Sequence, residues 1–276
     1  MNNLIKLILF FITLMKFSTT ADAQGMKMGE VLIISTSTLK TDAKPDEFQN
    51  YINKEISPAW NKNNSVTSIH LFLADRGEKK GASLLVCEAD KMSERNSLPQ
   101  GSPFTDKIFV APNTKSKSLS DFLTDPNSFV EYHLIGADNF KSTPAVSLLG
   151  IHFIKVKPER AEDFEKFVAG KLNPAVGQLL PDLRLMYYKA VASDNKKNIG
   201  GYITIFAIES SATREKYWPT GAPETETLKK AFQPLKDLAA ELGSYLVKGS
   251  YLEPESGGAA AYFESLSWTD FVERDF

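Results

Sequence analysis

The sequence predicts an α+β fold made of two consecutive units, each with the element order βαββαβ. The first observation is that the chain repeats itself. One set of residues recurs at a constant offset of 116 positions: Phe48, Pro58 and Ala59 in the first half, and Phe164, Pro174 and Ala175 in the second. The second observation is that Pro99–Pro103 matches Pro219–Pro223 at an offset of 120. A repeat of this kind indicates tandem structural units.

The first strand and first helix of each unit follow from local sequence. Val31–Thr38 and Leu148–Val156 are apolar and rich in β-branched residues, which is typical of strands. Helical patterns then begin at Pro45 and Pro158, where proline's missing N–H costs nothing. Pro58 and Pro174 predict the ends of these helices, because proline clashes with the preceding helical turn.

The remaining elements complete the same order in both halves. Second strands are predicted at Val66–Leu73 and Leu183–Lys189, and hairpins connect them to third strands at Ala82–Glu88 and Gly201–Ile208. A helix with an apolar stripe follows in the second half at Glu224–Leu242. Last strands are predicted at Phe129–Ile135 and Tyr245–Leu252. The four-position change of offset coincides with the longer polar loop at 193–198, where insertions are tolerated.

The N-terminus predicts export. A basic start, an apolar run over Leu7–Met15 and the A-x-A site at Ala21–Ala23 form a secretory signal peptide, with cleavage after Ala23. The apolar run is shorter than the roughly 20 residues that a membrane-spanning helix needs. We therefore expect a periplasmic or secreted protein with no membrane span after signal cleavage. Cys87 is the only cysteine in the sequence and is predicted to be a small buried residue.

Charge excludes one class of partner. The formal net charge of the full chain is -2, so no positive field gathers phosphate backbones, and we predict no nucleic-acid partner.

The passage Leu149–Phe167 resembles the first strand, the basic-proline turn and the acidic first helix of the dimeric α/β barrel superfamily. This superfamily includes antibiotic-biosynthesis-type monooxygenases and NIPSNAP-type and EthD-type proteins. The resemblance spans roughly Val31 to Glu253. It implies ferredoxin-like units that pair their sheets into a barrel, here within one chain, which leaves monomer and homodimer open.

These inferences divide the chain into four parts: signal peptide 1–23, first repeat 24–145, second repeat 146–254 and an aromatic, acidic tail 255–276. Within the tail, Ser267 and Asp270 predict a capped short helix that places Trp268, Phe271 and Val272 on one side. This helix is expected to dock on the protein's own barrel, with partner binding or coverage of the pocket as the alternatives.

Strand alternation predicts which side chains line a cavity. The repeat places Ser68, His70 and Phe72 with Arg184, Met186 and Tyr188 on one face of the second strands. On the third strands it matches Leu84 with Thr204, and the face that carries Tyr202 and Thr204 is the expected cavity wall. The opposite face, with Ile203 and Ile205, is expected to pack against helices. The predicted ligand-binding residues are His70, His152, Arg184, Tyr188 and Tyr202.

No catalytic residue can be named from this set, because a histidine on a strand can equally be structural. The sequence contains no H-E-x-x-H, CxxC, G-x-S-x-G, GxGxxG or P-loop motif, so no metal site and no cofactor is predicted.

Two functions remain open. The first is a non-catalytic protein that binds a small apolar or aromatic ligand in the barrel cavity. The second, by analogy with the resembling superfamily, is a cofactor-independent monooxygenase or isomerase, with His152 or His70 as proton acceptor. A haem-binding protein is the third alternative, since some members of that superfamily hold haem through a histidine.

Overall fold

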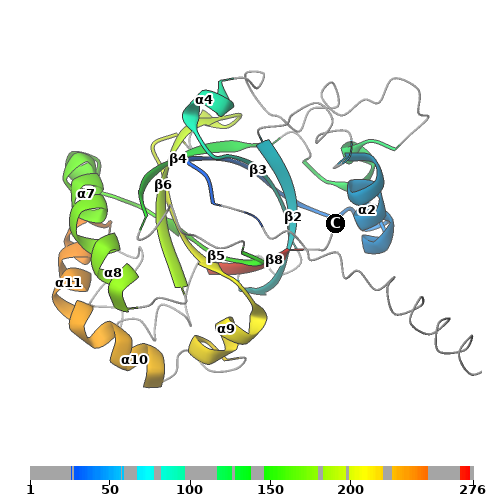
Figure 1. Ribbon diagram of the computed structural model, residues 1–276. Coiled ribbons are helices and arrows are strands. Elements are labelled where there is room, and N and C mark those ends of the chain that lie inside the picture. Colours follow the sequence, from blue (N-terminus) through cyan, green and yellow to red (C-terminus); the bar gives the residue numbers. More distant parts are fainter. Residues whose placement is uncertain are drawn as a thin grey trace, which may run out of the picture.

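A computed structural model shows an α+β protein with eight strands in a closed barrel (Figure 1). The structure describes residues 26, 28–56, 58, 67–77, 82–96, 117–125, 128–137, 146–179, 183–196, 199–219, 226–247 and 268–273. The predicted signal peptide lies outside the described residues, as do 97–116 and most of Pro219–Pro223. No helix in the described ranges is long and apolar enough to cross a membrane.

The first unit forms a four-stranded antiparallel sheet with the order β4-β1-β3-β2. Its elements are β1 (Val31–Thr38), α2 (Pro45–Tyr51), the π-helix η1 (Ile52–Ile56), β2 (Thr67–Gly77), β3 (Ala82–Ala89), α4 (Met92–Arg95), α6 (Leu119–Phe122) and β4 (Val130–Ala137).

The second unit repeats this arrangement in the order β8-β5-β7-β6. Its strands are β5 (Leu148–Ile154), β6 (Leu183–Ser193), β7 (Tyr202–Ile208) and β8 (Trp268–Glu273). Its helices are η3 (Pro158–Arg160), α7 (Ala161–Phe167), the π-helix η4 (Val168–Leu172), α8 (Asn173–Leu179), α9 (Ser211–Tyr217), α10 (Glu226–Phe232), η6 (Gln233–Leu235) and α11 (Lys236–Tyr245).

Each unit's last strand pairs with the other unit's second strand. Strand β4 pairs with β6 and β8 pairs with β2, both antiparallel, and these two seams close the ring. Closure leaves neither sheet with an unpaired edge. The predicted fold class, two ferredoxin-like units that form one barrel within a single chain, is therefore confirmed.

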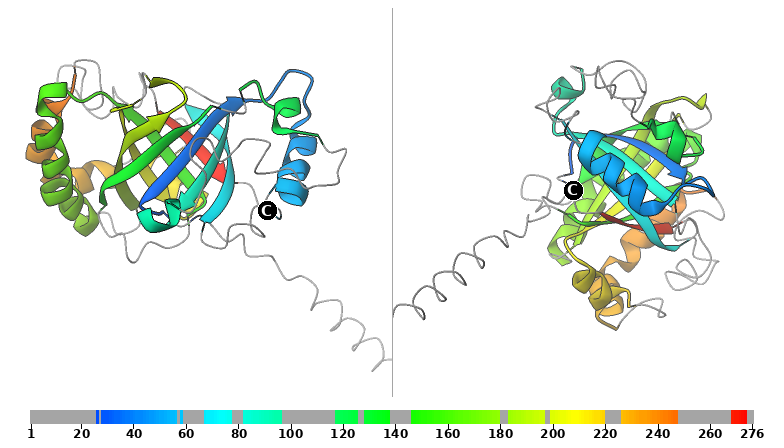
Figure 2. Two further views of the ribbon diagram at one scale, coloured as in Figure 1. Left: turned by 90° about the horizontal axis from the view of Figure 1, so that it is seen from above. Right: turned by 90° about the vertical axis from the view of Figure 1, so that its right-hand side faces the viewer.

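Three hydrophobic cores hold the molecule together. One fills the barrel and includes Leu32, Phe72 and Met186. The other two lie between a sheet and its helices, around Phe48 in the first unit and Phe164 in the second. Figure 2 shows the two helical layers on opposite sides of the barrel.

The tail forms a strand, so the predicted tail helix is wrong. Strand β8 lies between β2 and β5, with Val272 opposite Leu73 on one side and opposite Leu148 on the other. It is the fourth strand of the second unit, the place we had given to Tyr245–Leu252. Tyr245 instead ends α11, and Leu246 forms an isolated bridge with Val156. Without β8, strands β2 and β5 would each have an unpaired edge. A strand between them satisfies the backbone N–H and C=O groups of both edges.

The predicted helix end at Pro174 is also wrong. A π-helical turn precedes the proline in each unit, η1 before Pro58 and η4 before Pro174, and α8 continues beyond Pro174. A π-turn widens the helix, which relieves the clash between a proline ring and the preceding turn. The two π-helices occupy equivalent positions at the 116-residue offset.

The third strands correct the predicted cavity wall. Leu84 and Val86 in β3 and Ile203 and Ile205 in β7 all belong to the barrel core, so the two third strands correspond at an offset of 119 rather than 120. An odd difference exchanges the two faces of a strand. Accordingly, Ile203 and Ile205 belong to the barrel core, whereas Tyr202 and Phe206 belong to the helix-packing core.

Candidate functional site

The N-terminal segment fills one end of the barrel. Met26 and Met28 are buried in the barrel core, and Met26 pairs with Val146 through N···O distances of 3.0 and 2.9 Å. Figure 1 shows this segment, in blue before β1, inside the ring of strands. We call this end of the barrel, defined by Met26, Met28, Ser68, His70, Glu88 and Tyr188, the floor.

The floor carries a buried polar chain. The Ser68 hydroxyl donates to Glu88 Oε2 at 2.8 Å and lies 2.7 Å from His70 Nε2. The hydroxyl of Tyr188 donates to the carbonyl of Gly29 at 2.9 Å. A Cβ at Gly29 would lie 2.6 Å from Glu88 Oε1 and 2.2 Å from the Ala89 carbonyl, so only glycine lets the N-terminal segment approach this closely.

Burial disfavours the ionised form of the Glu88 carboxyl. Burial, followed by a hydrogen bond with Asp90, raises the pKa of the Glu88 carboxyl to about 8, although the hydrogen bond from Ser68 opposes this shift. Burial, with the charge of Glu88 second, also raises the pKa of Tyr188. The floor is thus a buried, hydrogen-bonded part of the core in which an ionised Glu88 is disfavoured.

The opposite end of the barrel opens into a cavity of about 530 Å³, which we call the mouth. This volume falls within the roughly 300–1,000 Å³ typical of small-molecule sites. Its walls are mainly apolar and its rim is polar. The wall residues include Ile34, Leu84, Tyr132, Ile151, Phe153 and Ile203, and the rim residues include Thr36, Asp125, Ser128, Lys155, Asp194 and Asn195.

Two hydroxyl groups in the mouth can orient a ligand. Tyr132 belongs to the barrel core and is only 6% exposed, yet it lines the cavity, and its hydroxyl has no hydrogen-bond partner among the described residues. Burial raises the pKa of Tyr132, so its hydroxyl keeps its proton and can donate. Thr36, on β1, supplies a second hydroxyl to the same cavity.

The structure separates the five predicted ligand-binding residues. His70 and Tyr188 lie on the floor. Arg184 lies on β6 two residues before Met186, so it shares the inward face of that strand and lies at the floor end of the barrel. Tyr202 touches the mouth, but its ring packs 5.1 Å from that of Phe164 and its hydroxyl donates to Glu165 at 2.7 Å.

His152 lies in the helix-packing layer. It is 3% exposed, and its ring makes an edge contact with Phe206 at 5.9 Å. Burial lowers the pKa of His152 to about 3, which keeps the imidazole neutral. His70 and His152 therefore face different compartments of the fold, one inside the barrel and one outside it.

The mouth does not fit a histidine-ligated haem. The sequence has three histidines, and none is among the described residues that line the mouth. His70 contacts Ser68, His152 lies under the helices, and His133 pairs with Glu131 through an Nε2···Oε1 distance of 2.9 Å. No cluster of three or more potential metal ligands occurs in the described part of the chain.

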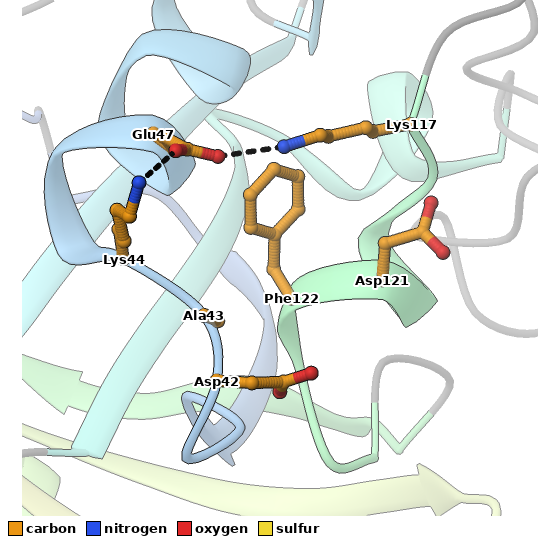
Figure 3. Close-up of a pocket in the computed structure, with 7 residues that line it drawn as sticks. All are labelled: Asp42, Ala43, Lys44, Glu47, Lys117, Asp121 and Phe122. Carbon is orange, nitrogen blue, oxygen red and sulfur yellow. Dashed lines mark hydrogen bonds and ion pairs between the residues drawn. The ribbon is translucent and has the colours of Figure 1, made fainter.

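A second cavity, of about 610 Å³, lies outside the barrel between α2 and α6 (Figure 3). Glu47 bridges Lys44 at 3.0 Å and Lys117 at 2.7 Å, and these contacts, led by the hydrogen bond from Lys117, lower the pKa of Glu47 to about 2. The Lys117 ammonium also lies 5.1 Å from the centre of the Phe122 ring. Because the cationic groups already have internal partners, the mouth is the stronger candidate site.

Sequence reasoning missed most of the mouth. Ile151 and Phe153 could have been found from alternation along the first strand of the second unit, and Tyr132 from alternation along β4. Asp125 and Asp194 carry no such signal, because they lie in loops next to strand ends.

No family model matches the chain, and no curated protein matches it. Among solved structures, the chain is similar to an anthrone oxidase-like protein at 9% identity, with a TM-score of 0.48 over 88% of this chain and 91% of the other. It is similar to a mutant chlorite dismutase from Candidatus Nitrospira defluvii at 11% identity, with a TM-score of 0.46 over 90% and 93% of the two chains.

A third similar structure is a Listeria monocytogenes ferredoxin-fold protein related to antibiotic biosynthesis monooxygenases, at 12% identity. Its TM-score is 0.36 over 93% of this chain and 99% of the other. At identities of 9–12%, these likenesses concern the fold alone.

Proposed function

We propose that this protein is an exported binding protein that holds a small apolar or aromatic molecule in the mouth of its barrel without transforming it. The observation that carries this proposal is the mouth itself: a cavity of about 530 Å³ that has mainly apolar walls and a polar rim and is lined by two hydroxyl-bearing residues, Tyr132 and Thr36. Sites that bind small molecules combine these two features, apolar walls for affinity and a few polar groups for orientation.

The enzyme alternative needs a proton acceptor beside the ligand. His70 lies on the floor and His152 in the helix layer, and neither is among the described residues lining the mouth. Acid–base chemistry by either histidine would require it to reach the reacting atom. A cofactor-independent monooxygenase or isomerase therefore has weaker support than binding alone.

Phe153 offers a direct test, because it lines the mouth and is already 39% exposed, so its removal need not unfold the protein. Titration with N-phenyl-1-naphthylamine, a neutral aromatic dye, should give saturable binding to the wild type. Phe153→Ala should weaken binding about fivefold, since an aromatic contact contributes on the order of 1 kcal/mol.

Met92→Ala is the matched control. Met92 is 36% exposed and lies on α4, away from the mouth. This variant should bind the dye like the wild type. Absence of dye binding to the wild type, or equal binding by both variants and the wild type, contradicts the proposal. Recovery of a chemically changed ligand after incubation would favour the enzyme alternative.

A further inference from the structure

We infer that the mouth selects apolar or aromatic molecules that carry a positive charge, such as arylalkyl ammonium compounds, over those that carry a carboxylate. This inference rests on the proposed binding function and adds the charge of the ligand. Three features of the mouth carry it: two rim carboxylates, the smaller positive charge at the rim and two aromatic side chains in the walls.

The rim carboxylates are held in place by contacts that leave carboxylate oxygens available. Asp194 Oδ1 accepts hydrogen bonds from the Phe129 amide at 3.0 Å and from the Ser193 hydroxyl at 3.2 Å. None of the described hydrogen bonds uses its second oxygen. The Ser193 hydroxyl shares its one proton with the Phe129 carbonyl at 2.9 Å, so the Phe129 amide is the main donor that fixes this carboxylate at the edge of the cavity.

Asp125 is fixed through its backbone instead. Its amide donates to the Ser37 hydroxyl at 3.1 Å, and its carbonyl accepts from the Ser128 hydroxyl at 3.1 Å. Its carboxylate forms no ion pair with any residue in the described ranges, although it lines the mouth. Asp125 thus adds an exposed negative charge to the lining of the mouth.

Positive charge at the rim is weaker. Lys155 is the one cationic residue among the described residues that line the mouth, so two carboxylates face one ammonium. Lys189, on the neighbouring strand β6, lies 2.8 Å from Glu165 and is neutralised by it. A carboxylate ligand would therefore meet net repulsion at the rim, and an ammonium ligand would meet net attraction.

The walls reinforce this preference. Tyr132 and Phe153 present aromatic rings to the same cavity, and the faces of aromatic rings attract cations. The hydroxyl of Tyr132, buried and without a described partner, gives the ligand a polar contact below the rim. An apolar body against the walls and an ammonium group between the rim carboxylates would satisfy both regions.

Competition against N-phenyl-1-naphthylamine tests the inference with three ligands that share one ring system: 2-naphthylmethylamine, 2-naphthalenemethanol and 2-naphthoate. At neutral pH and low salt, the amine should displace the dye at a concentration about tenfold lower than the carboxylate, with the alcohol between them. Raising the salt to about 0.5 M should narrow the gap, because salt screens charges at an exposed rim.

The double variant Asp125→Asn and Asp194→Asn should remove the gap between the concentrations at which the amine and the carboxylate displace the dye. Asparagine at 194 keeps an oxygen that can accept from Phe129, so the loop should hold its shape. If the dye binds but the carboxylate competes as well as the amine, or the gap persists in the double variant, the inference is overturned and the binding function stands. If the dye does not bind the wild type, both fail.

Discussion

The buried carboxyl on the floor makes stability depend on pH in a predictable direction. Glu88 has a pKa of about 8 in the folded protein, against an ordinary value of 4.5. The folded state therefore keeps a proton that the unfolded state releases. Above about pH 4.5 the unfolded chain is favoured increasingly, and the effect levels off once the pH exceeds about 8. Stability should fall as the pH rises across this window.

The variant Glu88→Gln removes this dependence. Glutamine stays neutral at every pH and can still accept the hydrogen bond from Ser68. Each pKa unit corresponds to about 1.4 kcal/mol, so the free energy of unfolding of the variant should rise relative to that of the wild type by about 3 kcal/mol between about pH 5 and about pH 8.

Urea unfolding, followed by circular dichroism at several pH values, measures this difference. Glu159→Gln is the control, because Glu159 is an exposed carboxylate in η3 and its removal reports the effect of a surface charge alone. Parallel pH profiles for the wild type and Glu88→Gln would refute the reasoning, since they would mean that Glu88 ionises alike in the folded and unfolded states.

Three other perturbations have defined outcomes. Because burial lowers the pKa of His152 to about 3, the wild type should lose stability as the pH falls below about 6.5, by roughly 3 kcal/mol at about pH 4.5, and His152→Gln should flatten this loss in acid-unfolding curves. Glu131→Gln leaves the buried guanidinium of Arg95, which it contacts at 2.7 Å, without its charged partner, and should lower the free energy of unfolding in urea by about 3–5 kcal/mol. Deleting Trp268–Glu273 should expose the edges of β2 and β5 and cause concentration-dependent association in analytical ultracentrifugation, and a monodisperse truncated chain would contradict the role of β8.

The parts of the fold that local physics determines could be predicted from the sequence. The first strands and the helix starts at Pro45 and Pro158 are confirmed, because side-chain alternation and the geometry of proline act over a few residues. Burial of Cys87 is confirmed for the same reason, since it lies in a short apolar run that forms β3.

The errors arose where distant parts of the chain decide the outcome. No local signal distinguishes Trp268–Glu273 as a strand, because its partners lie far away in the sequence. The face of β7 was assigned across a loop of altered length, and an error of one residue in that loop exchanged Tyr202 with Ile203. Pro174 ends no helix because a π-turn precedes it, and π-turns have no reliable sequence signature.

The candidate site was hard to predict because both ends of the barrel have the same inward-facing pattern. Tyr132 on β4 and Tyr188 on β6 both belong to the barrel core. They lie close together on paired strands, because Tyr132 is opposite Ala190, which is two residues after Tyr188. Yet Tyr188 donates to Gly29 inside a filled floor, whereas Tyr132 faces the mouth. The difference comes from Met26 and Met28, before β1, which fill the floor. Ligand space in this barrel is therefore set by which end these residues occupy, a property that strand alternation alone does not encode.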